Sequence, residues 1–250
     1  MRSTSGTTFF SLPTELRLQI AVYALEQSDD VGILPPHDQV RIDPAYDAAT
    51  NLAILLVCRE FHRDFGTVAY QMTRFILAGN RLHTFSLISD IKLRNVRKVV
   101  VEADWLQIET WQTFPFNQDC VVLEELCVVP ITGGDYIRPV IGLLRRLQNV
   151  ERIRIFPWNA ECRLTYGRLV GAMYKDDHYH RYDADNAPVV ENTWWEPYFN
   201  SHDISLDFVK CEAEPVMAEE DYMVMMKPKI DEIMDWMDRW STLPASRINA

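Results

Sequence analysis

One pattern of apolar residues occurs three times in the middle of the chain, at Val96-Arg97-Lys98-Val99-Val100-Val101, Leu123-Glu124-Glu125-Leu126-Cys127-Val128 and Val150-Glu151-Arg152-Ile153-Arg154-Ile155. The first, fourth and sixth positions are apolar in each copy, and successive copies begin 27 residues apart. This alternation predicts a short strand in each copy, with a helix or loop in each interval. Because strands joined by such connections lie parallel with right-handed crossovers, we expect an α/β fold with a mostly parallel sheet.

The period of 27 residues lies within the range of leucine-rich repeats, whose strands line the concave face of an arc. The asparagine typical of those repeats would fall at positions that hold Asp104, Ile131 and Trp158. The repeats are therefore degenerate, and the alternative is an ordinary series of βαβ units, which also recurs about every 30 residues. We assign residues 79–250 to this repeat-like α/β body, which closes with a C-terminal helix.

The N-terminal stretch Phe9-Phe10-Ser11-Leu12-Pro13-Thr14-Glu15-Leu16, continued by residues 17–25, has the pattern of a helix. Pro13 suits the first helical position, where its missing N–H costs nothing, and Glu15 follows in the first turn. Apolar residues occur on more than one side of this helix. We expect one side to pack on the chain's own domain and the other side to be available to a partner.

A longer pattern begins in the same helix. It consists of Leu12-Pro13-x-Glu15-Leu16-x-x-x-Ile20, then Leu55-Leu56-Val57-Cys58-Arg59-Glu60-Phe61, and then Asp64, Tyr70 and Phe75. This pattern resembles an F-box, and it is most similar to the divergent F-box-like proteins of filamentous fungi. Residues 28–50 separate its two halves and contain several Asp and Pro residues and Gly32, so they are predicted to form an inserted loop.

The resemblance implies that residues 1–78 form a helical module that binds the adaptor protein of a cullin-type ubiquitin ligase. It implies that the adaptor-binding residues are Leu12, Pro13, Leu16, Ile20, Leu55, Leu56 and Phe61. The body would then recruit a protein substrate of unknown identity. In the alternative, the F-box-like helices are structural and the chain is a stand-alone scaffold or binding protein. Exposure of Leu12 and Leu16 separates these hypotheses, because a docking surface must be accessible.

The charge distribution argues against one class of partner. The net charge of the 250 residues is −11, and residues 176–250 contain all of this excess. An acidic surface opposes the phosphate contacts of nucleic-acid binding, so no nucleic-acid partner is expected. Neither a membrane-spanning run nor a signal peptide is recognisable, so we expect an intracellular protein, cytoplasmic or nuclear, without a membrane partner. Five cysteines without a Cys-x-x-Cys pair fit reduced thiols.

Two segments of the acidic last third are candidate ligand sites. One is an aromatic group made of Trp194, Trp195, Tyr198 and Phe199. Such a group suits a partner interface, a ligand pocket or simple packing onto the core. The other contains His178 and His180, predicted on the same side of a strand, with nearby aspartates as further ligands for zinc or iron.

A solvated acidic loop is the alternative for the histidine segment, so no cofactor is expected. An enzyme or ligand-binding protein that uses residues 176–203 is the remaining functional alternative. No serine-nucleophile, phosphate-loop or dinucleotide motif occurs in the chain, so no catalytic residue is assigned.

Local patterns predict the other elements. A helix capped by Asn51 is expected to run to about Tyr70, with Cys58 on its buried face, and a short strand is expected at 75–77. Helices are expected at 81–90 and 163–173, and a strand at 204–208. The last helix is expected from about Glu219 to Trp240, with a break at Pro228.

Overall fold

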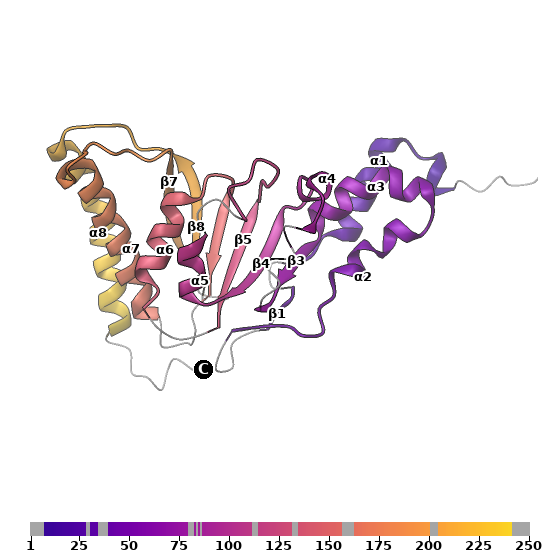
Figure 1. Cartoon of the computed structure of the whole chain (residues 1–250), viewed down its shortest axis with the longest axis horizontal. Helices are drawn as coiled ribbons and strands as arrows, with labels where there is room; N and C mark the ends of the chain where they lie inside the picture. Colours follow the sequence, from indigo (N-terminus) through magenta and orange to yellow (C-terminus); the bar gives the residue numbers. More distant parts are fainter. Residues whose placement is uncertain are drawn as a thin grey trace, which may run out of the picture.

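The computed structural model describes residues 8–28, 31–34, 40–79, 83, 85, 87–111, 115–131, 135–156, 163–200 and 205–241. Its centre is a six-stranded sheet in the order β3-β4-β5-β6-β8-β7 (Figure 1). The strands are β3 (Arg74–Leu77), β4 (Lys98–Ala103), β5 (Glu125–Pro130), β6 (Arg152–Ile155), β7 (Thr193–Asn200) and β8 (Ser205–Glu212). The first four strands are parallel, and β8 pairs antiparallel with both β6 and β7. The expected α/β fold with a mostly parallel sheet is confirmed.

The three copies of the apolar pattern form neighbouring strands in register. Val99 of β4 lies opposite Leu126 of β5, which lies opposite Ile153 of β6. The first positions of the second and third copies also form a parallel bridge, between Leu123 and Val150. One period of 27 residues is therefore one step across the sheet, and equivalent residues of the copies lie side by side on the same face.

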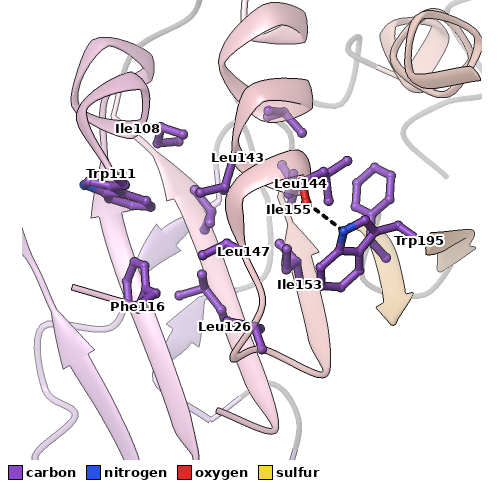
Figure 2. Close-up of a cluster of buried hydrophobic side chains, with 14 of the residues drawn as sticks. Ile108, Trp111, Phe116, Leu126, Leu143, Leu144, Leu147, Ile153, Ile155 and Trp195 are labelled. Atoms are coloured by element: carbon purple, nitrogen blue, oxygen red, sulfur yellow. Dashed lines mark hydrogen bonds between the residues drawn. The ribbon is translucent and has the colours of Figure 1, made fainter. Parts of the chain in front are cut away.

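Helices cover one face of the sheet. They include α5 (Trp105–Thr110), α6 (Ile137–Arg146) and α7 (Arg163–His178), while the short α4 (Asp90–Leu93) precedes β4. Figure 2 shows Leu143 of α6 and Leu147, which follows that helix, lying over Leu126 of β5, and all three side chains are buried. Asp104, which stands where a repeat asparagine was expected, accepts a hydrogen bond from the backbone N–H of Gln107 (2.8 Å) and so caps α5.

Part of the segment that was expected to be an inserted loop covers the opposite face of the sheet, over β4 and β5. This segment contains the strands β1 (Ile33–Leu34) and β2 (Arg41–Ile42), which pair antiparallel, and the start of α2 (Ala48–Leu52). Ile33 and Val40 pack on Val100, Cys127, Val129 and Phe156 in a second buried cluster. Gly32 has a φ of 80°, and a Cβ there would collide with Ile76, so the turn before β1 requires glycine.

Arg74, the first residue of β3, joins the N-terminal segments to the sheet. Its guanidinium contacts the Glu125 carboxylate at 2.5 Å and donates to the carbonyl of Val31 at 3.2 Å. Its backbone N–H donates to Gln27, and its carbonyl accepts from the Tyr46 hydroxyl (2.6 Å). The predicted units 1–78 and 79–250 thus share one sheet, because β3 belongs to the first range and pairs with β4 of the second.

The N-terminal helices are α1 (Thr14–Leu25), α2 and α3 (Arg59–Met72), with 3-10 helices at Phe9–Ser11 and Ala53–Leu56. Packing of α1 on α3 buries Ala21, Leu25, Phe65 and Ala69. Pro13 lies at the N-cap and not at the first helical position as expected. Glu15 is in the first turn, as predicted.

The predicted helix from Asn51 to Tyr70 is wrong in two respects. Asp47 is the cap, since its carboxylate accepts from the backbone N–H of Ala49, while Asn51 donates to the Leu25 carbonyl and to Thr73. The helix is also interrupted at Cys58, whose extended backbone begins α3. Cys58 is therefore exposed and not on a buried face, whereas Cys127 is a core thiol as expected.

The C-terminal third departs most from expectation. Residues 179–183 form a π-helical turn that continues α7, and the aromatic group lies on the regular strand β7. The last helix, α8 (Glu219–Ser241), is continuous through Pro228. Pro228 has no backbone N–H, so it leaves the carbonyl of exposed Val224 without its helical partner. The strand expected at 204–208 is β8, and the strand at 75–77 is β3.

Of the helix expected at 81–90, only residues 83, 85 and 87–90 are described; α4 begins at Asp90.

Candidate functional site

The F-box-like residues of α1 point away from the core of the N-terminal helices. Leu16 is 46% exposed and Ile20 is 45% exposed, one turn apart on the same side of the helix. Ala21 and Leu25, on the other side, are buried against α3. The helix is therefore apolar on both sides, and only one side is covered by the described residues.

The other residues of the pattern are exposed or half-buried. Leu56 is 86% exposed, and Pro13 is also exposed. Leu12, Leu55 and Phe61 are half-buried. Phe61 stacks on Phe9, with ring centroids 5.5 Å apart, so it contributes to the packing of the helices as well as to their surface.

An ion pair holds α1 and α3 in this arrangement. Arg17 of α1 contacts Asp64 of α3 at 2.7 Å, and both side chains are nearly buried. The Arg17 guanidinium also lies over the ring of Phe10, 5.6 Å from its centroid. Asp64, the acidic residue of the F-box-like pattern, therefore fixes the angle at which α1 presents Leu16 and Ile20.

Most of the aromatic group on β7 is internal. The indole N–H of Trp195 donates to the Leu144 carbonyl (2.8 Å; Figure 2), and Trp194 stacks on Tyr174 of α7. Phe199 contacts the ring of Trp236 on α8. Only Tyr198 is exposed. Trp194, Trp195 and Phe199 therefore join β7 to its neighbours, while Tyr198 and Phe199 also line a pocket of about 210 Å³ that Trp236 of α8 helps to form.

The histidine segment does not form the predicted strand. His178, the last residue of α7, makes contacts through both ring nitrogens: Nδ1 with Asp183 (3.2 Å) and Nε2 with Glu219 of α8 (3.1 Å). His180 lies in the π-helical turn, 3.8 Å from Asp176. Within the described residues, no three His, Cys, Asp or Glu side chains are placed to hold a metal ion.

Sequence reasoning did not find a buried polar network beside this segment. Arg181 donates to Asp177 (2.7 Å) and to the carbonyl of Pro215 (3.0 Å), and the Tyr222 hydroxyl donates to the same Asp177 oxygen (2.7 Å). Burial, reinforced by this hydrogen bond, raises the pKa of Tyr222. The network fixes the start of α8 against α7. Asp177 and Arg181 are four residues apart, but Pro215 and Tyr222 lie more than thirty residues further along the chain, so no local pattern reveals the network.

A groove between α7 and α8 is a second feature that the sequence did not reveal. Its volume is about 530 Å³, and its walls are mainly glycine, methionine, isoleucine and tyrosine side chains of the two helices. Figure 1 shows α7 and α8 side by side at one end of the molecule, with α1 and α3 at the opposite end. We call this feature the α7–α8 groove.

Comparison with known proteins gives no family assignment, since the chain matches no protein-family model, no curated protein and no solved structure. Across the described part of the chain, no helix combines the length and apolar character needed to cross a membrane.

Proposed function

We propose that this protein is an F-box-like substrate-recruiting subunit, in which α1 and the residues around Leu56 bind the adaptor of a cullin-type ubiquitin ligase. The observation that carries the proposal is the accessibility of Leu16 and Ile20, two positions of the F-box-like pattern, on the uncovered side of α1. The alternative in which these helices are purely structural requires Leu16 to be buried.

The energetics of an exposed apolar face support the same proposal. Full burial of a leucine or isoleucine side chain stabilises an interface by about 1.5–3 kcal/mol. Leu16 and Ile20 retain nearly half of their surface for a partner, and Leu56 retains most of it. Large apolar side chains exposed together on one helix face are typical of binding surfaces.

The body supplies the second part of the proposal. Its strands β4, β5 and β6 repeat one unit in register, which resembles the arrangement of leucine-rich repeats, the common substrate-binding partner of F-box helices. Two features connect the N-terminal helices to that body: β3 follows α3 and pairs with β4, and Arg74 of β3 forms an ion pair with Glu125 of β5. A rigid connection suits a protein that must position a substrate relative to the ligase.

The test is binding of the purified chain to a recombinant fungal ubiquitin-ligase adaptor. The variant Leu16→Asp/Ile20→Asp should weaken binding by at least about a hundredfold, since two apolar anchors are replaced by charges. The matched control is Leu87→Asp/Ile91→Asp, which places the same charges on two residues outside α1 that are 79% and 78% exposed. Circular dichroism and thermal unfolding check that both variants fold.

The proposal fails if the wild-type chain does not bind the adaptor, or if the α1 variant binds as well as the control. A variant that loses its fold would instead identify Leu16 and Ile20 as structural, and would favour the stand-alone scaffold.

A further inference from the structure

The shape of the α7–α8 groove follows from two glycines one turn apart in α7. A Cβ on Gly167 would lie 2.5 Å from Cγ of Met237, so the two helices touch at this point. A Cβ on Gly171 would meet no atom within 4 Å. The helices therefore diverge within one turn, and the space above Gly171 is an open hole in the side of α7.

The α8 wall of the groove is apolar and only partly covered. Met223, Ile230 and Met234 all line it, and each is exposed, with Met234 at 54%. Their spacing of seven and four residues places them in one row along the helix. Methionine side chains adapt to different partners, so they are common at surfaces that accept more than one apolar shape.

Two cations line the α7 side of the groove, together with Asp183 of the π-helical turn. Arg168 and Lys175 are seven residues apart, so they lie on the same side of α7, and both are exposed and line the groove. Neither side chain makes an ion pair or hydrogen bond within the described part of the chain. Two available cations are notable here because residues 176–250 are strongly acidic. They favour a ligand with negative charge along one edge.

We propose that the α7–α8 groove binds an amphipathic helix of a partner protein, with acidic residues along the edge that faces Arg168 and Lys175. An apolar side chain of that helix enters the hole above Gly171, and its neighbours at helical spacing pack on the row that contains Met234. The open wall favours a helix over a free fatty acid, because pockets for small ligands enclose most of the ligand.

If the protein recruits substrates as proposed, the helix that binds this groove belongs to the substrate. Binding of the helix itself does not depend on that proposed function; only its outcome, recruitment to the ligase, does. The groove and the exposed face of α1 lie at opposite ends of the molecule (Figure 1). The two proposals are therefore tested separately: groove variants should leave adaptor binding unchanged, and the α1 variant should leave helix binding unchanged.

The experiment is selection of a displayed library of helical peptides against the full chain. Enriched peptides should have apolar residues at i, i+3 or i+4, and i+7, with Asp or Glu on one flank. Gly171→Leu fills the hole and should weaken their binding at least about tenfold, whereas the control Gly171→Ala should change it less than about twofold. Arg168→Glu/Lys175→Glu should switch the enriched flank from acidic to basic.

Several results would overturn the proposal. They are enrichment of no helix, equal binding by Gly171→Leu, and saturable binding of palmitate without binding of any helix. If sedimentation shows that the chain is a dimer, and Gly171→Leu converts it to a monomer, then the groove is occupied by a second copy of this chain. Helix binding seen only in a variant that ends at Ser241 would make the chain's own C-terminal segment the occupant.

Discussion

The Arg74–Glu125 ion pair offers a sharp test of how the N-terminal segments are joined to the sheet. Arg74 is 1% exposed, and its contact with Glu125 is 2.5 Å. Removal of one partner leaves the other charge buried without its counter-ion, which costs about 3–5 kcal/mol. Glu125→Leu should therefore lower the free energy of unfolding by that amount, although Arg74 keeps its hydrogen bond to the Val31 carbonyl.

The double variant Arg74→Met/Glu125→Leu should be much more stable than Glu125→Leu alone. It replaces both charges with apolar side chains of similar volume, a change that is often neutral or stabilising. Both single variants and the double variant form a thermodynamic cycle, whose coupling energy should be at least about 2 kcal/mol.

The assay is urea denaturation followed by tryptophan fluorescence and by circular dichroism. With a slope of about 3 kcal/mol per M, the midpoint of Glu125→Leu should fall by about 1–1.7 M. A loss below about 1 kcal/mol in Glu125→Leu, or a double variant whose loss equals the sum of the two single losses, would refute the reasoning. Either result would mean that water reaches the pair and solvates the remaining charge.

Two further predictions concern α7 and α8. The same substitution should have opposite effects at two glycines of α7. Gly167→Ala should lower the free energy of unfolding by about 1 kcal/mol or more, because the new Cβ collides with Met237. Gly171→Ala should raise it by about 0.5–1 kcal/mol, because alanine has the higher helix propensity and its Cβ enters open space. Thermal unfolding measures both, and a shift of the same sign in the two variants would contradict the packing described. Burial raises the pKa of Tyr222 above its ordinary 10.0, so the folded chain keeps this proton after the unfolded chain has lost it. Its contribution to stability should therefore be constant below about pH 10 and fall above it, and Tyr222→Phe should reduce that alkaline loss in denaturation curves recorded between neutral pH and pH 11. An alkaline loss that is the same in Tyr222→Phe would show that other groups cause it.

Where patterns were local and periodic, prediction from sequence succeeded. The three apolar repeats predicted neighbouring strands because each strand needs apolar residues at alternate positions, and the equal spacing predicted one strand per repeat. The helix of residues 14–25 was also predictable, since its first-turn glutamate and apolar spacing depend only on nearby residues. Exposure of Leu16 was not predictable, because a helix that is apolar on two sides does not reveal which side its own domain covers.

Prediction failed where a distant partner decides the conformation. Asn51 has the chemistry of a cap, but its side chain bonds to Leu25 and Thr73 across the module, and Asp47 caps the helix instead. No strand was predicted for the aromatic group, but pairing with β8 makes it one. The histidines were expected on a strand, but they continue a helix whose turn is tied to α8 by His178.

The sequence by itself determined the α/β class, the number of central repeats and the apolar character of both sides of α1, because these depend on periodicity and composition within a few residues. Only the tertiary structure decided that residues 33 and 40 cover the second face of the sheet, and that Arg74 joins the N-terminal helices to the body. It alone created the α7–α8 groove, because the space above Gly171 depends on where the Met237 end of α8 lies against α7. Such positions are set by packing between segments far apart in the chain, which the order of residues does not display.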